Sequence, residues 1–323
     1  MLSRLLGPIR STTGTARWLL VAGVAITGVF VLMALLAPWI TPTDFAQRSV
    51  DGVKLPKLAS PSGEHWFGTN DQFYDIFSRV VWGARTALTV IVLSVLFSLV
   101  IGVVLGLVSG YVGGWTDRLL VFLTDALYAF PSLLLAIVFS FVLSNALGGG
   151  VVAAALSLTV VYIPQYFRVV RNTTVSAREA TYVEAARAIG AKDTTIMSRY
   201  LFGNVVQSVP VIGTLNAADA LATLAGLGFL GFGIQPNEAA EWGYDIERAL
   251  DDAQAGVWWP AIFPGAAIAL LVIGLTLIGE GLNETVNPAL RRRRLQEVVM
   301  PARGLATSGV AAAGTADGTE GER

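Results

Sequence analysis

Apolar residues occur along this chain in long runs separated by shorter polar segments. The first run, residues 18–40, carries no charge, and further runs follow at 86–110, 119–147, 151–167, 202–234 and 260–279. Each run can cross a bilayer once, which takes about 20 helical residues. Backbone groups in lipid must be satisfied within their own segment, so the runs predict helices. The pattern therefore predicts an all-α integral membrane protein with six transmembrane helices and both termini on one side.

Composition agrees with this pattern and excludes several classes of function. Apolar residues make up 54% of the 323 positions, charged residues make up 14%, and the mean hydropathy is +0.63. A soluble domain needs more charge to cover its surface. The net charge of −1 argues against nucleic-acid binding. The chain has no cysteine, which excludes disulfides and Cys-based metal sites, and its single histidine, His65, cannot form a metal cluster.

Basic residues predict the orientation, because cytoplasmic segments of membrane proteins are enriched in Lys and Arg. With a cytoplasmic N-terminus, 16 of the 22 Lys and Arg residues lie inside: Arg4, Arg10, Arg17, Arg118, Arg168, Arg171, Arg178, Arg187, Lys192, Arg199, Arg291 to Arg294, Arg303 and Arg323. Both termini are therefore expected in the cytoplasm.

The same pattern divides the chain into segments. We expect a cytoplasmic N-terminal segment at 1–17, an anchor helix at 18–40, an external loop at 41–85, a five-helix core at 86–290 and a cytoplasmic tail at 291–323. In the external loop, residues 76–85 are expected to form a short interfacial helix with Arg79 opposite its apolar face. The tail begins with basic residues and then has few large apolar groups, which predicts disorder.

The loop at 169–200, between the fourth and fifth predicted spans, has the pattern of two short helices joined by a glycine. Ser176 and Glu179 have the spacing of a capping box. Gly190 is suited to end the first helix in a left-handed conformation, and Asp193 to cap the second. In the first of these two helices, a small apolar stripe recurs at helical spacing: Tyr182, Val183, Ala186 and Ile189. Such a stripe suits either a partner's groove or the surface of the lipid, and the pattern alone leaves both open.

Residues 182–191 read Tyr-Val-Glu-Ala-Ala-Arg-Ala-Ile-Gly-Ala. This segment resembles the "EAA" loop of ABC-importer permeases, which forms a coupling helix that fits a cleft on the ATPase subunit. The resemblance implies an ATPase-coupling role for Tyr182, Val183, Glu184, Ala185, Ala186, Arg187, Ile189, Gly190 and Ala191. Members of that family often end the motif with a hydrophobic residue followed by Leu-Pro, whereas this chain reads Leu201-Phe202-Gly203.

Further motifs in the same order narrow the resemblance to the C-type permease of dipeptide and oligopeptide importers, over most of residues 15–292. They include His65-Trp-Phe-Gly-Thr69, Tyr111-Val-Gly-Gly-Trp115, Ala129-Phe-Pro131, Phe229-Leu-Gly231 and Phe263-Pro-Gly265. Asn70, Phe73 and Tyr74 depart from the residues usual in the external motif.

This resemblance implies an ABC type I importer permease fold in a bacterial cytoplasmic membrane. The implied partners are a homologous B-type permease, two ATPase subunits, an external peptide-binding protein and the lipid bilayer. The chain contains no Gly-x-x-x-x-Gly-Lys-Ser/Thr phosphate loop. We therefore expect ATP and Mg to be bound by the ATPase subunits, with no cofactor and no catalytic residue in this chain.

Asp219 is the charged residue deepest within a predicted span. A carboxylate there is costly unless it faces water or a partner. Three interpretations stay open. Asp219 lines the translocation path, together with Asn216, Thr223 and Pro131, or it makes a structural hydrogen bond to a neighbouring helix, or it is a protonated side chain without a role. Pro131 is also expected to kink the third span, because proline interrupts helical hydrogen bonding.

Two other classes of protein fit the sequence less well. A secondary transporter predicts inverted repeats and acidic residues in several spans, and an intramembrane hydrolase requires clustered catalytic groups. Neither pattern is evident in the sequence. The cargo stays open among dipeptides, longer peptides, glutathione, nickel complexes and opine-like solutes, because the external binding protein usually selects it.

Overall fold

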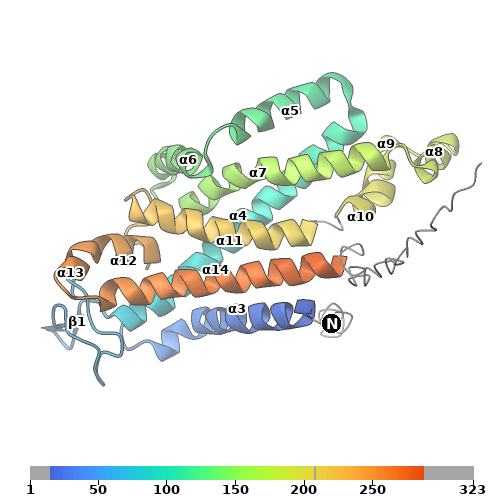
Figure 1. The fold of residues 1–323 in the computed structure, drawn as a ribbon. Coiled ribbons are helices and arrows are strands. Elements are labelled where there is room, and N and C mark those ends of the chain that lie inside the picture. The colour runs from blue at the N-terminus through green and yellow to red at the C-terminus, as the bar shows by residue number, and fades with distance from the viewer. Residues whose placement is uncertain (1–14, 207–208, 287–323) are drawn as a thin grey trace, which may run out of the picture.

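The computed structural model describes residues 15–206 and 209–286 (Figure 1). The expectations for residues 1–14 and for the tail at 291–323 lie outside these ranges. The longer helices are α3 (Thr15–Ile40), α4 (Ile76–Val112), α5 (Gly114–Tyr128), α6 (Ser132–Leu147), α7 (Gly150–Ala177), α11 (Val209–Phe229) and α14 (Trp259–Val286). The shorter elements are β1 (Ser49–Val50), β2 (Val53–Lys54), α8 (Thr181–Ala188), α9 (Asp193–Thr195), the π-helical turn η1 (Ile196–Leu201), α10 (Phe202–Val205), α12 (Trp242–Arg248) and α13 (Leu250–Gln254).

Within the described residues, α3, α4, α7, α11 and α14 are long and apolar enough to cross a membrane. The pair α5 and α6 makes a sixth span if it is counted as one, which confirms the predicted all-α membrane fold. This pair is bent by 97° at a short break. Pro131 occupies the N-cap of α6, with φ −54° and a non-helical ψ of 130°. Proline also has no backbone N–H with which to continue the hydrogen bonding of α5. The kink predicted at Pro131 is therefore a bend of about a right angle between α5 and α6.

Helix α4 begins earlier than the sequence pattern predicted. Asp75 caps it, with its Oδ1 accepting a hydrogen bond from the Ser78 N–H at 2.8 Å, and the helix then runs for 37 residues, about 55 Å. Residues 76–85 are its first turns, so the expected separate interfacial helix is wrong. Arg79, expected opposite the apolar face, has a side chain that is only 2% exposed. Packing against later segments of the chain overrides the local pattern here.

Three glycines on α4 allow it to pack closely against α7. Gly102, Gly106 and Gly110 are spaced four residues apart, the small-xxx-small pattern of helix contacts in membranes. A Cβ added at Gly102 would lie 2.5 Å from the Tyr166 Cβ, and one at Gly110 would lie 2.7 Å from the Thr174 Cβ. Larger side chains at these positions would push the two helices apart. This pattern is visible in the sequence, but the sequence analysis did not use it.

The long helices lie side by side in a bundle (Figure 1). In that view α3 packs against α14, α14 against α11, and α11 against α7, with α5 and α6 beside α7 at the opposite edge. Helix α4 passes behind them and contacts α3, α5, α7, α11, α12 and α14. Helix α4 is thus the central element, and it joins the two ends of the bundle.

The segment between α3 and α4 folds back onto the start of α4. The short hairpin of β1 and β2 pairs Ser49 with Lys54. The His65 Nδ1 lies 3.0 Å from Asp75 Oδ2, and the His65 side chain is 14% exposed. The Trp259 indole also donates to the Thr69 carbonyl at 3.2 Å. These contacts tie the segment between α3 and α4 to both α4 and α14.

Candidate functional site

Helix α8 presents an exposed face at one end of the molecule. Val183 and Ala186 point inward and are buried, whereas Glu184 and Ala185 are exposed and the Ile189 side chain is 79% exposed. Ile189 is the C-cap of α8, and the described part of the chain leaves most of its side chain uncovered. The predicted apolar stripe is therefore split, with half of it holding α8 in place and half of it facing outward.

A Schellman motif ends α8 at Gly190. The N–H of Ala191 donates to the Ala186 carbonyl at 3.0 Å, and the N–H of Gly190 donates to the Arg187 carbonyl at 2.9 Å. Gly190 has φ +80°, which glycine adopts without strain. The left-handed turn predicted at Gly190 is confirmed.

The start of α8 differs from the prediction. Ser176 lies in the last turn of α7 and its hydroxyl donates to the Asn172 carbonyl at 3.2 Å, so the predicted capping box is wrong. Ala180 occupies the N-cap and makes no side-chain cap. Asp193 does not cap the following helix either, because its Oδ1 accepts from the Tyr111 hydroxyl at 2.6 Å. Ser176 thus bonds back to a carbonyl of its own helix, whereas Asp193 makes a tertiary contact.

Tyr111, in the last turn of α4, holds the α8 segment to the bundle. Its hydroxyl bonds Asp193, and the Arg187 guanidinium lies 5.5 Å from the centre of its ring. Arg178 donates to the carbonyl of Gly110 at 3.0 Å. The neighbouring residues Gly110 and Tyr111 therefore contact Arg178, which precedes α8, and Asp193, which follows it. The end of α4 thus contacts α8 and the residues that flank it.

Asp219 lies near the middle of α11, where it makes a hydrogen bond to a neighbouring helix and also lines a cavity. Its Oδ2 accepts a hydrogen bond from the Tyr162 hydroxyl of α7 at 2.8 Å. The residue is nonetheless exposed, and it lines a cavity of about 200 Å³. The cavity walls come from α5, the α5–α6 break, α6, α7 and α11: Leu127, Tyr128, Phe130, Ser132, Leu135, Val161, Gln165 and Asp219. A hydrogen-bonded carboxylate thus faces an open space between helices.

The other predicted pathway residues lie around this cavity and do not line it. Thr223 is buried, with its Oγ1 3.1 Å from the Tyr162 hydroxyl. Asn216 is buried as well. Pro131 stands at the break between Phe130 and Ser132, the two neighbours that line the cavity. Asp219 is therefore the polar group through which α11 reaches this space.

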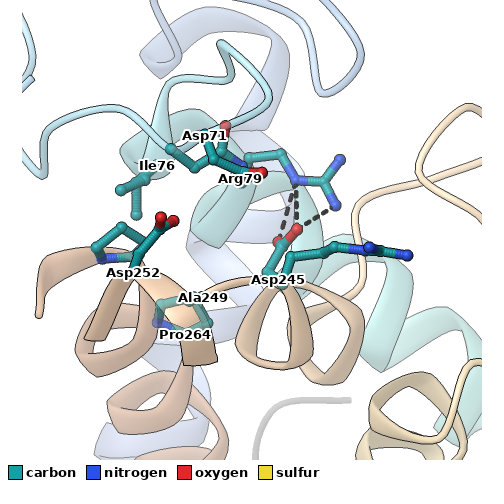
Figure 2. Close-up of a pocket in the computed structure, with 10 residues that line it drawn as sticks. Asp71, Ile76, Arg79, Asp245, Ala249, Asp252 and Pro264 are labelled. Atoms are coloured by element: carbon teal, nitrogen blue, oxygen red, sulfur yellow. Dashed lines mark hydrogen bonds and ion pairs between the residues drawn. The ribbon is translucent and has the colours of Figure 1, made fainter. Parts of the chain in front are cut away.

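A buried ion pair joins α4 to α12 at the other end of the molecule. Figure 2 shows Arg79 and Asp245 pointing toward one another, and the Arg79 Nη2 lies 2.6 Å from Asp245 Oδ1. The Arg79 Nε donates to both carboxylate oxygens at 3.0 Å, and its Nη1 donates to the Phe45 carbonyl at 3.1 Å. The adjoining pocket has a volume of about 10 Å³, room for about one water molecule. This pocket is far too small for a peptide, and the pair is a buried contact between α4 and α12.

Glu241 caps α12 beside this pair. Its carboxylate accepts the N–H groups of Gly243 at 2.9 Å and Tyr244 at 2.7 Å. Burial raises the pKa of Glu241 to about 8, against the opposing effect of those two N–H groups. A Cβ at Gly228 of α11 would overlap the carboxylate, so α11 and α12 approach closely only because residue 228 is glycine. The sequence analysis did not identify Arg79, Asp245 or Glu241 as a unit.

The fold and these sites define a polytopic helical membrane protein with a short exposed helix at one end and a cavity between its spans. Residues 102–292 match the family described as "Binding-protein-dependent transport system inner membrane component". The chain belongs to this family and is an ABC-importer permease, which confirms the resemblance drawn from its motifs. Membership of a binding-protein-dependent system argues against the secondary-transporter interpretation.

Curated relatives cover most of the chain. It is 36% identical over 273 residues to the dipeptide transport system permease protein DppC of Alkalihalophilus pseudofirmus, covering 84% of this chain and 86% of that protein. It is 39% identical over 272 residues to the glutathione transport system permease protein GsiD of Salmonella typhimurium, with the same coverage. The Shigella flexneri GsiD is 39% identical over 263 residues, covering 81% of this chain and 84% of that protein.

Proposed function

We propose that this chain is one of two permeases of a peptide importer that is driven by separate ATPase subunits. The observation that carries the proposal is the outward face of α8, which exposes Glu184, Ala185 and Ile189 and ends at the Gly190 turn. Small side chains allow close approach, and Ile189 supplies an apolar contact for a groove. Because α8 is held by the end of α4, movement of a docked ATPase reaches the spans.

The proposed orientation places α8 in the cytoplasm. Both chain termini are then cytoplasmic, and the end of the bundle that carries Arg79 and Asp245 faces outward. The excess of Lys and Arg on the α8 side supports this orientation. A B-type permease completes the cavity beside Asp219, and an external binding protein delivers the cargo to the outer end. ATP and Mg belong to the ATPase subunits.

Co-purification of this chain with the ATPase subunits tests the docking site. Glu184→Lys places a cation on the exposed face, and Ile189→Asp removes its apolar contact. We expect each to weaken ATPase retention by about tenfold or more, the equivalent of about 1.4 kcal/mol. Glu64→Lys makes the same charge reversal on an exposed residue at the opposite end and serves as the control. Retention that is unchanged in both α8 variants would show that α8 is not the docking helix.

We propose peptides as the cargo, with the Asp219 carboxylate meeting the ammonium group of the peptide. Its position in an open cavity supports this role. Uptake of a labelled dipeptide by cells with the complete importer should fall in Asp219→Asn. The exposed Asp125, paired with Arg168 at 3.0 Å, provides the control Asp125→Asn. Equal uptake in both variants would remove Asp219 from the pathway.

Glutathione is the second candidate cargo, favoured by the identity to the glutathione permeases. It also carries an ammonium group, so Asp219 does not distinguish the two solutes. Competition does: an excess of unlabelled glutathione added to the dipeptide uptake assay should leave uptake unchanged if dipeptides are the cargo. Strong inhibition by glutathione, with direct uptake of labelled glutathione, would favour the second candidate.

A further inference from the structure

A groove between α3 and α4 is unexplained by transport. It has a volume of about 440 Å³, within the range of about 300–1,000 Å³ common for small-molecule sites. Its walls are almost entirely aliphatic and come from the two helices: Val31, Ala34 and Leu35 of α3, and Leu88, Thr89, Val92 and Leu93 of α4. Arg85 is the one charged residue that lines it.

The aromatic residues at one end of the groove indicate the level of the membrane surface. The Trp82 indole donates to the Thr41 hydroxyl at 3.2 Å, which places the end of α3 beside the first turns of α4. Trp39 is 77% exposed next to this contact. Tryptophans of this kind gather at the boundary between lipid and water. Arg85 lies about one turn, or 5 Å, inward from Trp82, and Val92 lies about 10 Å deeper still.

Arg85 is poised for an anion that the chain itself does not provide. Within the part of the chain that the structure describes, Arg85 forms no ion pair with a carboxylate. Its guanidinium is exposed and lies 5.4 Å from the centre of the Trp82 ring. A cation stacked on an aromatic ring retains its hydrogen-bond donors, and the planar guanidinium matches the oxygens of a phosphate.

We propose that the α3–α4 groove binds an anionic phospholipid, with its phosphate on Arg85 and one acyl chain along the aliphatic wall. The groove runs inward from the level of Trp82 as an acyl chain runs from its headgroup, and its single charge lies at the outer end. The lipid fastens α3, whose main contacts with the long helices are to α14 and α4, to the first half of α4. This inference does not depend on the cargo or on ATPase docking.

Native mass spectrometry of the detergent-purified full chain, titrated with phosphatidylglycerol, tests the proposal. The wild type should retain one phosphatidylglycerol more tightly than phosphatidylcholine. Arg85→Gln should weaken this binding by about tenfold or more, as expected for the loss of a charged hydrogen bond, and Arg85→Lys should restore part of it. Arg118→Gln, which removes an exposed arginine of α5 that lies outside the groove, should leave it unchanged.

A second pair of variants tests whether the shape of the groove matters when the charge of Arg85 is kept. Val92→Trp fills the groove with Arg85 intact and should also weaken phosphatidylglycerol binding. Leu96→Trp adds the same side chain one turn farther along α4, where it does not line the groove, and should not. Equal binding in Val92→Trp and Leu96→Trp would overturn the proposal. So would an assembled importer that binds no lipid where the isolated chain binds one, because a partner helix would then occupy the groove.

Discussion

The buried pair of Arg79 and Asp245 gives the sharpest test of the structure. Its two side chains are 2% and 7% exposed, and the contacting atoms lie 2.6–3.0 Å apart. Removing one partner leaves the other charge buried without compensation, which costs about 3–5 kcal/mol. Arg79→Met and Asp245→Leu should therefore each lower the free energy of unfolding by that amount, roughly two to three and a half orders of magnitude in the folded-to-unfolded ratio.

The double variant should be less damaging than either single variant. With both charges replaced by apolar groups, no buried charge is left unpaired, and such replacements are often close to neutral. A double-mutant cycle, measured by unfolding in mixed micelles with increasing dodecyl sulfate, should therefore give a coupling of several kcal/mol.

An exposed pair provides the control for this cycle. The side chains of Arg168 and Asp125 are 47% and 56% exposed at a separation of 3.0 Å, so their coupling should be about 1 kcal/mol or less. Additive effects of Arg79→Met and Asp245→Leu would refute the reasoning, since they would mean that the two side chains do not meet in the membrane.

Two further predictions concern Glu241 and Gly102. Burial raises the pKa of Glu241 from 4.5 to about 8, so its stabilising neutral form is fully present below about pH 4.5 and is lost as the pH rises through 8. The thermal unfolding temperature in detergent should therefore fall between pH 5 and pH 9 in the wild type and change less in Glu241→Gln; an identical slope would contradict this assignment. Gly102→Leu should destabilise the chain by about 1–3 kcal/mol, because a Cβ there already lies 2.5 Å from Tyr166, whereas Gly28→Leu, with open space around it, should be close to neutral.

The segment that carries α8 shows both the reach and the limit of local sequence patterns. The turn at Gly190 was predictable because its φ of +80° depends on the residue itself. The capping roles assigned to Ser176 and Asp193 were wrong for different reasons. Helix α7 continues through Ser176, whose hydroxyl bonds the Asn172 carbonyl one turn earlier, whereas Asp193 has a partner that the local sequence could not reveal. Asp193 bonds Tyr111, which lies 82 residues earlier.

The sequence by itself determined the membrane class, the spans and the family, because long apolar runs and local motifs carry that information within single segments. Only the tertiary structure decided three further features. They are the 97° bend at Pro131, the burial of Arg79 against Asp245 and the exposure of Asp219 to a cavity. Arg79 and Asp245 are separated by 166 residues, so no local pattern links them. A charged residue, considered by itself, is expected to be exposed to solvent. It is buried in the core only when folding brings a residue of opposite charge into contact with it.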